Sequence, residues 1–243
     1  MKKDKIYKES LARIGDFRFD EQVADVFADM IERSVPGYRS IISMLEILAR
    51  HYAQEDSMLY DLGCSLGTST LSMWRGLDEK KDCRIIAVDN SSAMVTRFRH
   101  RLQEDALEDQ ITVLEEDLLD TQIKNASLVV MNFTLQFIPL NRREELLHRI
   151  AQGLRPGGVL VLSEKIQFES PALQKSMVDF HHEFKRAHGY SDLEVSQKRS
   201  ALEKVLIPET IPTHRNRLLD AGFSSCEVYF QCFNFVSMLA IKE

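Results

Sequence analysis

Residues 58–72 constrain the fold of this chain more than any other stretch. An apolar run of strand length leads to Asp61, and two glycines four positions apart, Gly63 and Gly67, follow. Threonine and serine hydroxyls then mark the start of a helical pattern. Glycines suit a loop in which a ligand lies against bare backbone, because they adopt unusual dihedral angles and carry no Cβ atom. The stretch therefore predicts a strand, a tight loop and a helix whose first N–H groups face a ligand.

The length and composition are typical of one globular α/β protein. The chain has 243 residues, of which 44% are hydrophobic and 28% are charged, and we expect a single domain over residues 1–243. No apolar run approaches the ~20 residues of a membrane span. The first residues are polar and do not lead into the apolar segment of a signal peptide, so we expect a cytoplasmic protein with no membrane partner.

The charge balance and the cysteines argue against two further classes of site. A net charge of −6 is unfavourable for a surface that binds a phosphate backbone, because such a surface needs clustered Lys and Arg. We therefore expect small-molecule chemistry and no direct nucleic-acid binding. Cys64, Cys83, Cys226 and Cys232 show no CxxC spacing, and none adjoins a histidine, so we expect no bound metal.

Apolar segments of strand length alternate with helical patterns along the chain. This alternation predicts an α/β fold with a mostly parallel sheet, right-handed crossovers and helices on both faces. A final apolar pair with a short link predicts an antiparallel hairpin, which brings the sheet to seven strands. Residues 155–158, Arg-Pro-Gly-Gly, are expected to break the chain before the fifth strand. The expected strands are residues 58–60, 84–88, 111–114, 126–131, 159–163, 225–230 and 233–241.

Two helical regions lie outside this alternation. Residues 1–55 are expected to form an N-terminal cover, with a polar arm followed by two helices. Residues 167–210 carry two consecutive helical patterns and are expected to be an insertion after the fifth strand. It would lie above the carboxyl ends of the strands, where open α/β sheets bind ligands. The helices expected in these two regions are residues 20–36, 39–52, 172–188 and 192–206.

Three kinds of site use a glycine-rich loop like that of residues 63–67. A dinucleotide fold requires G-x-G-x-x-G, and the loop fails at the middle and last glycines, although Asp89 is well placed to hold a ribose. A hydrolase elbow requires G-x-S-x-G, which the loop matches, but an elbow follows a mid-sheet strand and this loop follows the first strand. The third kind is the loop of class I methyltransferases that binds a methionine nucleoside. There an acid at the strand end precedes a glycine-rich turn, as Asp61 does here.

Polar residues at the ends of successive predicted strands favour the third kind of site. Asp61 and the loop after it are expected to bind the amino-acid part, with Asn132 beside the sulfonium. Asp89 is expected to bind two ribose hydroxyls, and Asp117 the adenine amino group. Carboxylates suit these partners because they accept several hydrogen bonds, although one acid alone is equally typical of a solvated loop. Tyr38, between the first two predicted helices, is a further candidate for the pocket.

Several short blocks carry a resemblance that extends beyond this loop. They are Val35-Pro36-Gly37-Tyr38, Asp61-Leu62-Gly63-Cys64-Ser65-Leu66-Gly67, Asp89-Asn90-Ser91, Asn132-Phe133-Thr134-Leu135-Gln136-Phe137, Phe184-Lys185-Arg186-Ala187, Ser196-Gln197-Lys198-Arg199-Ser200 and Phe230-Gln231-Cys232-Phe233-Asn234-Phe235. Together they resemble the carboxy-S-adenosyl-L-methionine synthase family of the class I methyltransferase superfamily. The resemblance extends from about residue 10 to the end of the chain, and several blocks lie outside the shared methyltransferase core.

The resemblance implies an activity that is unusual for this fold. The family converts S-adenosyl-L-methionine (SAM) and prephenate to carboxy-S-adenosyl-L-methionine (carboxy-SAM) and phenylpyruvate, with no metal. A partner tRNA carboxymethyltransferase uses the product to modify the wobble uridine of tRNA. The resemblance also implies a homodimer. The ligand contacts that it places on this chain are Tyr38, Gly63, Cys64, Ser65, Asp89, Asn90, Asp117, Leu118, Asn132 and Arg199.

Arg199, in the expected insertion, is our candidate for binding the carboxylate of the ligand. Its guanidinium binds a carboxylate through two parallel hydrogen bonds, which lysine does not match. Tyr38 is expected to donate to the same carboxylate. No side chain is singled out as a catalytic base, and Arg199 is open to action in its own subunit or across a dimer. The alternative interpretations are an ordinary SAM-dependent methyltransferase acting on a small molecule or tRNA, and a nucleoside-binding scaffold.

Overall fold

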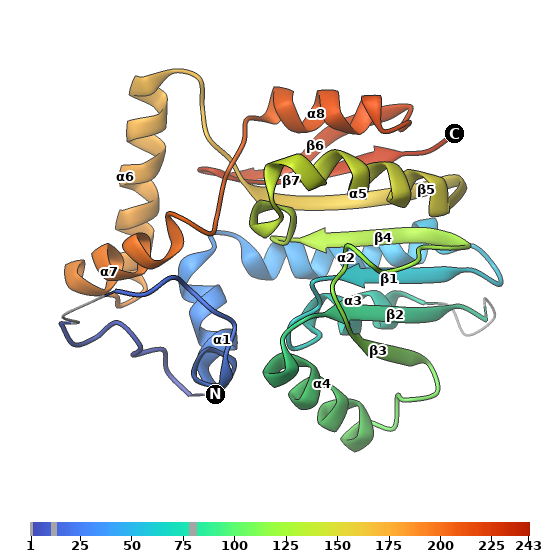
Figure 1. Cartoon of the computed structure of the whole chain (residues 1–243), viewed down its shortest axis with the longest axis horizontal. Coiled ribbons are helices and arrows are strands. Elements are labelled where there is room, and N and C mark those ends of the chain that lie inside the picture. The colour runs from blue at the N-terminus through green and yellow to red at the C-terminus, as the bar shows by residue number, and fades with distance from the viewer. Residues whose placement is uncertain (1, 11–13, 78–81) are drawn as a thin grey trace.

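The computed structural model describes residues 2–10, 14–77 and 82–243. One seven-stranded sheet in the order β3-β2-β1-β4-β5-β7-β6 forms its centre (Figure 1). The strands are β1 (Met58–Leu62), β2 (Arg84–Asp89), β3 (Ile111–Glu115), β4 (Ala126–Asn132), β5 (Leu154–Lys165), β6 (Ser225–Cys232) and β7 (Phe235–Ile241).

The sheet is mixed. Strands β1 to β5 pair in parallel, as the alternation of strands and helices predicts. Strand β7 runs antiparallel to both β5 and β6, so the predicted final hairpin is confirmed and joins the same sheet. The strand order reverses direction between β1 and β4. Open α/β sheets bind ligands at such a reversal, next to the carboxyl ends of the strands.

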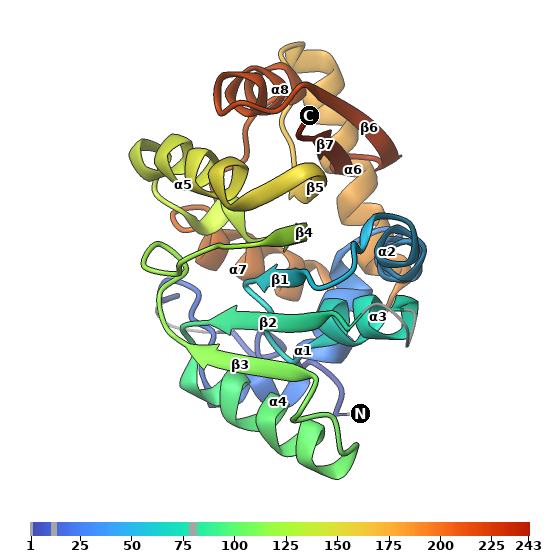
Figure 2. The same cartoon turned by 90° about the vertical axis from the view of Figure 1, so that its right-hand side faces the viewer.

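Helices cover both faces of the sheet (Figure 2). Helices α2 (Tyr38–Tyr52), α3 (Thr68–Gly76) and α4 (Ser92–Glu104) bury their apolar sides on one face. Helices α5 (Leu140–Gly153) and α8 (Ile211–Asp220) bury theirs on the other face. Every helix in the described ranges falls short of the length and apolar character that a membrane crossing requires.

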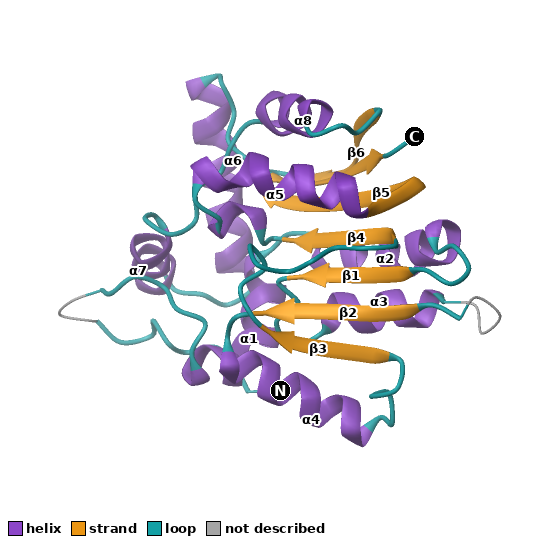
Figure 3. Cartoon of the chain, turned by 45° about the vertical axis from the view of Figure 1, so that its right-hand side comes forward, coloured by secondary structure: helices purple, strands orange, loops and turns teal. Residues whose placement is uncertain are grey.

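Three helices lie beside the carboxyl ends of the parallel strands. They are α1 (Glu21–Ser34), α6 (Pro171–Ala187) and α7 (Asp192–Leu202). In Figure 3 the arrowheads of the parallel strands point toward the side of the molecule where these helices are drawn. The two helical patterns between the fifth strand and α8 therefore fold as predicted, although α7 ends at Leu202 and a turn follows it.

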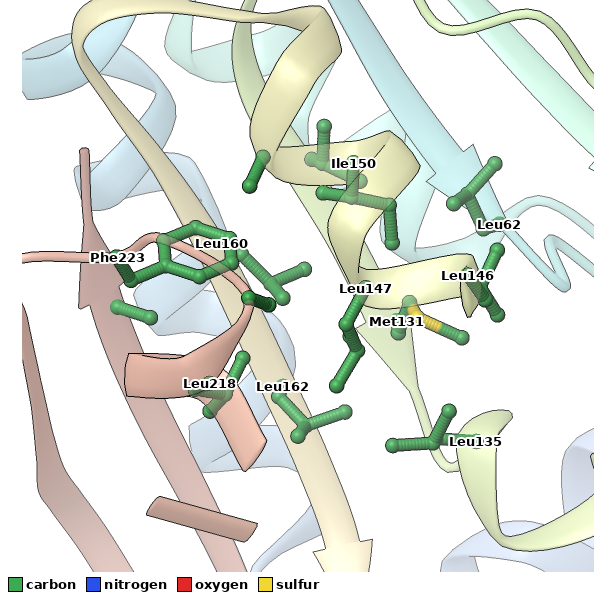
Figure 4. Packing of buried hydrophobic residues seen from close by; sticks show 14 of the residues in the cluster. Leu62, Met131, Leu135, Leu146, Leu147, Ile150, Leu160, Leu162, Leu218 and Phe223 are labelled. Atoms are coloured by element: carbon green, nitrogen blue, oxygen red, sulfur yellow. The ribbon is translucent and has the colours of Figure 1, made fainter. Parts of the chain in front are cut away.

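The core between α5 and the sheet is built from fully buried aliphatic side chains. Leu146, Leu147 and Ile150 project from one side of α5 toward Leu62 and Met131 of the sheet (Figure 4). The spacing of three and four residues places these three side chains on one stripe of the helix. Burial of this stripe fixes α5 against the middle of the sheet.

Strand β5 begins earlier than the sequence predicts. It starts at Leu154 and includes residues 155–158, which the Pro-Gly-Gly run was expected to keep out of the sheet. Ala126 of β4 pairs with Leu154, whereas Leu128 pairs with Val159, so the register shifts across this run. The residues form a bulge, because a bulge absorbs extra residues without ending the strand and a glycine tolerates its unusual dihedral angles.

The N-terminal arm is held by a buried carboxylate. Asp4 is 1% exposed, and its Oδ2 accepts a hydrogen bond from the Tyr190 hydroxyl at 2.5 Å. The Lys198 amine lies 3.5 Å from the same oxygen. Arg33 of α1 donates to the Asp4 carbonyl oxygen at 3.2 Å. The arm thus ties α1 to α7, and it fixes the helix that carries Arg199.

Replacing Leu146 by alanine is expected to lower the free energy of unfolding by roughly 2–5 kcal/mol, because the missing side chain leaves a cavity. Leu140, at the start of the same helix, is 53% exposed and provides the matched control. We expect Leu140→Ala to change the free energy of unfolding by less than about 0.5 kcal/mol. Equilibrium unfolding in urea measures both values, and equal losses would contradict the packing of α5 described above.

Candidate active site

The loop after β1 is fixed to the end of β2 by its backbone. The N–H groups of Gly63 and Cys64 both donate to the Val88 carbonyl oxygen, at 2.8 and 2.9 Å. Gly63 has a φ of +86°, and a Cβ atom there would lie 2.3 Å from the Thr134 hydroxyl oxygen. A Cβ atom on Gly67, where φ is +78°, would lie 2.0 Å from the Phe98 ring. Both glycines are therefore required by close contacts within the protein, a reason that the sequence pattern alone does not show.

Asp89 joins this loop to the helix that follows β2. Its Oδ2 accepts a hydrogen bond from the Ser65 N–H and its Oδ1 accepts one from the Ser91 N–H, both at 2.8 Å. Burial raises the pKa of Asp89, and the two N–H donors oppose that shift. Each carboxylate oxygen has two lone pairs. The side chain therefore keeps one acceptor position on each oxygen, which matches two neighbouring hydroxyl groups.

Two polar side chains at the ends of β1 and β4 carry oxygens without partners. Asp61 is fully buried and accepts a hydrogen bond from the Thr70 hydroxyl at 2.5 Å on one oxygen. Asn132 donates to the Ser69 hydroxyl at 3.0 Å. The other oxygen of Asp61 and the side-chain oxygen of Asn132 have no hydrogen-bond partner among the described residues. An unsatisfied buried acceptor costs about 1–3 kcal/mol. Both oxygens are closed to solvent in this structure, so an N–H donor from a ligand removes that cost only when the neighbouring side chains move aside.

These oxygens fit the amino-acid part of SAM. Its ammonium group supplies donors to acceptors that the protein leaves free, and the sulfonium charge favours the same acidic surroundings. Burial raises the pKa of Asp61 to about 7, the Thr70 hydrogen bonds oppose this shift, and the nearby charge of Asp89 adds to it. The position next to Asp61 is thus one where a bound cation has a large electrostatic effect.

Tyr38 lies close to this acid. It is buried at the start of α2, and the nearby Thr68 side chain opposes the upward shift of its pKa. Burial raises the pKa of Tyr38 well above its usual value, and the charges of Asp61 and Glu32 raise it further. The phenol is therefore protonated at neutral pH and available as a donor.

The other predicted contacts occupy the same edge of the sheet. Cys64 is buried, and burial raises the pKa of its thiol well above the usual value, so it is not a nucleophile. Asn90 is exposed after β2. Asp117 is exposed after β3 and accepts a hydrogen bond from the Leu119 N–H at 2.9 Å. Leu118 is half-buried against the main core.

Arg199 stands apart from the loop after β1. It lies in α7 and is exposed. Lys165 is the last residue of β5. Burial lowers its pKa, and the positive charge of Arg199 lowers it further. The guanidinium therefore acts on the carboxyl end of β5, whereas Tyr38, Asp61 and Asn132 gather around β1 and β4.

A buried acid that the sequence analysis did not assign to the site supports the loop after β4. Glu164 is 1% exposed, and its Oε1 accepts a hydrogen bond from the Leu135 N–H at 2.9 Å. Burial raises the pKa of Glu164 to about 8, and the charge of Arg143 opposes this shift. The Gln136 side chain in turn accepts a hydrogen bond from the Lys165 N–H at 3.0 Å. The only sequence signal for this role is the position of Glu164 at a strand end.

No metal centre is visible in the part of the chain that the structure describes. His, Cys, Asp and Glu side chains there form no group of three that suits a metal ion. Cys64 and Cys226 are buried thiols that form no disulfide bond within the described residues.

Comparison with known proteins defines the class of this fold. Residues 59–158 match the family model of a methyltransferase domain. The chain is similar to an O-methyltransferase family protein from Burkholderia thailandensis, with a TM-score of 0.64 and 18% identity over 93% of this chain and 61% of that one. It is also similar to human N-acetylserotonin methyltransferase in complex with SAM, with a TM-score of 0.60 and 17% identity over 91% of this chain and 55% of that one. The fold is that of the SAM-dependent methyltransferases.

Closer relatives define the family. A protein of Geobacter sp. (strain M21) named carboxy-S-adenosyl-L-methionine synthase is 57% identical over 242 residues, 99% of either chain. The protein of the same name from Aliivibrio fischeri is 54% identical over 239 residues, 98% of either chain. The chain belongs to the carboxy-S-adenosyl-L-methionine synthase family, and it is therefore a transferase.

Replacing Gly63 by alanine is expected to weaken SAM binding by roughly tenfold or more, since the new methyl group meets Thr134 and displaces a loop that must hold the ligand closely. Gly157 provides the matched control, because its φ is +75° but its Cβ atom would come no closer than 3.6 Å to a neighbour. Gly157→Ala has similar backbone strain away from the site and is expected to bind SAM as the wild type does. Calorimetric titration with SAM compares the two variants; equal affinities would show that the loop does not contact the ligand.

SAM binding is expected to release a proton from Asp61 near pH 7. In the free protein its pKa of about 7 leaves roughly half of these carboxyls protonated, and an adjacent ammonium lowers that pKa. Because this pKa exceeds that of the unfolded chain, Asp61 also makes the free protein less stable as the pH rises from about 4 to 7. Calorimetric titration in two buffers of different ionisation enthalpy measures the proton release. Asp61→Asn is expected to abolish this release, and an unchanged release in that variant would refute the assignment.

Proposed function

We propose that this enzyme converts SAM and prephenate to carboxy-SAM and phenylpyruvate. Family membership over nearly the full length supports this activity. The structural observation that carries the proposal is the division of the site into two parts. Free acceptors of Asp61 and Asn132 lie on one side, and the positive charge of Arg199 acts at the end of β5 on the other. The first part suits a sulfonium amino acid, and the second suits a carboxylate.

The nucleoside is held by side chains at successive strand ends. Asp89 accepts hydrogen bonds from the two ribose hydroxyls through the acceptor positions that Ser65 and Ser91 leave free. Asp117 accepts from the adenine amino group, next to Leu118. Asp61 and the loop of residues 63–67 bind the amino-acid part, and Asn132 lies beside the sulfonium.

The proposed reaction balances without a further reactant. Prephenate loses carbon dioxide and hydroxide to give phenylpyruvate, and the methyl group of SAM loses a proton that combines with the hydroxide to form water. The carbon of the carbon dioxide becomes bonded to the former methyl carbon. The task of the protein is to hold both reactants together and to exclude water. Arg199 binds the transferred carboxylate through two parallel hydrogen bonds. The protonated hydroxyl of Tyr38 donates a hydrogen bond to the same carboxylate.

The proposed cellular role follows from the product. We propose that carboxy-SAM passes to a tRNA carboxymethyltransferase, which modifies the wobble uridine of tRNA in the cytoplasm. We also propose that the enzyme acts as a homodimer. Leu173 and Phe180 of α6 are 41% and 47% exposed, and burial of this apolar surface against a second copy would be favourable.

Incubation of the purified enzyme with SAM and prephenate is expected to give phenylpyruvate and a SAM derivative heavier by one carbon dioxide, which mass spectrometry detects. Transfer of an unmodified methyl group to an acceptor, without the heavier product, would favour the ordinary methyltransferase. Ligand binding without turnover would favour a scaffold.

Arg199→Ala is expected to bind SAM as the wild type does but to bind carboxy-SAM about tenfold or more weakly, because one charge-assisted bidentate contact is lost. Arg186 is also a partly exposed arginine of the insertion, paired with Glu183 and Asp192 at the surface, so Arg186→Ala is the control and is expected to keep the preference. Competitive binding of SAM and carboxy-SAM measures the preference of each variant for carboxy-SAM. An unchanged preference in Arg199→Ala would refute the assignment.

A further inference from the structure

Two lysine amines near the carboxyl end of β5 lack a counter-charge. Lys165 ends β5 and is half-buried, and Lys185 lies in α6 with 5% of its surface exposed. Within the described ranges, neither amine forms an ion pair or a hydrogen bond, and neither is among the polar atoms that are sealed from solvent. Both amines therefore border accessible space. Burying an unpaired ammonium is costly, so these positions need an explanation.

The surroundings of the two amines are positively charged. Burial lowers the pKa of Lys165, and the positive charge of Arg199 lowers it further. Burial, followed by the charges of Lys198 and Lys165, lowers the pKa of Lys185 to about 7. Burial, followed by the charges of Lys185 and Lys165, lowers the pKa of His181 well below its usual value. An anion in this place would offset the repulsion and restore the charge of the amines.

Lys198 shows how the fold supports a buried lysine that has a purely structural role. Its amine donates to the Ser34 hydroxyl at 2.9 Å and lies 3.5 Å from the Asp4 carboxylate. Lys165 and Lys185 have no partner of this kind in the described part of the chain. Contacts within the protein therefore explain why the Lys198 amine is buried, but they do not explain the burial of Lys165 and Lys185.

A short chain of aromatic contacts connects the two amines to the SAM site. Phe133 follows Asn132, and its ring meets the Phe235 ring edge to face at 5.9 Å between centroids. Phe235 pairs with Lys165 in the sheet. Its ring also meets the His181 ring at 4.9 Å, and His181 lies one helical turn before the second lysine. The residues that carry the two amines are thus connected to Asn132 through the Phe133 and Phe235 rings.

We propose that Lys165 and Lys185 bind the carboxylate that prephenate keeps when it becomes phenylpyruvate. This inference rests on the proposed function, in which Arg199 binds the other carboxylate, the one that is transferred. A dicarboxylate then spans two adjacent cationic positions, and each carboxylate meets its own counter-charge. The pair of lysines selects prephenate over acids with one carboxylate, and it holds the pyruvyl chain while the ring loses its substituents.

The test uses Lys165→Met and Lys185→Met, which remove the charge and keep most of the side-chain length. Lys175 is the control, because it lies in α6, is exposed and pairs with Asp179 at the surface. Calorimetric titration of enzyme loaded with S-adenosyl-L-homocysteine measures phenylpyruvate binding without turnover. Each lysine variant is expected to bind phenylpyruvate about tenfold or more weakly, as the loss of a charge-assisted contact predicts. Carboxy-SAM binding to the unloaded enzyme is expected to stay unchanged, and Lys175→Met is expected to change neither affinity.

The outcomes separate this inference from the proposed function. If both methionine variants bind phenylpyruvate as tightly as the wild type while the wild type makes carboxy-SAM, the lysine site is wrong and the function stands. If phenylpyruvate binding depends on the lysines but no carboxy-SAM forms, the function is wrong and the site stands. Lys185→Arg, which keeps a positive charge, is expected to retain more phenylpyruvate affinity than Lys185→Met; equal losses would point to packing and would overturn the inference.

Discussion

The two hydrogen bonds from the Gly63 and Cys64 N–H groups to the Val88 carbonyl oxygen hold the ligand-facing edge of the sheet together. They fix the loop after β1 against β2, which lets the Ser65 N–H reach Asp89. The same loop places the first turn of α3 where its hydroxyls hold Asp61 and Asn132. The buried acceptors, the two hydrogen bonds of Asp89 and the close approach of Thr134 all depend on this one backbone junction.

Local patterns predict most of the fold, and long-range contacts account for what they miss. Five apolar segments give the parallel strands, and the strand-end residues Asp61, Asp89 and Asn132 come from the same pattern. The bulge at residues 155–158 was not predictable, because strand pairing with β4 overrides the breaking tendency of Pro-Gly-Gly. The supporting role of Glu164 and the clustering of Lys165 with α6 depend on residues brought together only by folding.

The charges at this edge of the sheet are separated according to the substrates that we propose. In the described part of the chain, acceptors without partners lie near β1 and β4, where a cationic sulfonium amino acid would bind. Within the same residues, amines without partners and an exposed guanidinium lie near β5, α6 and α7, where a dianion would bind. Opposite charges held in adjacent places bring two oppositely charged reactants into contact, and this arrangement reduces the entropic cost of their encounter. A catalytic base need not be assigned to a protein side chain for this arrangement to be effective.

The anchoring of Asp4 connects the start of the chain to the helix that carries Arg199. Tyr190, Lys198 and Arg33 all contact this one residue in the interior. Any outward movement of α7 must either carry residues 2–10 along or separate the Asp4 carboxylate from its buried partners. The position of α7 beside the carboxyl ends of the parallel strands is therefore coupled to the amino-terminal arm, more than 180 residues away in sequence.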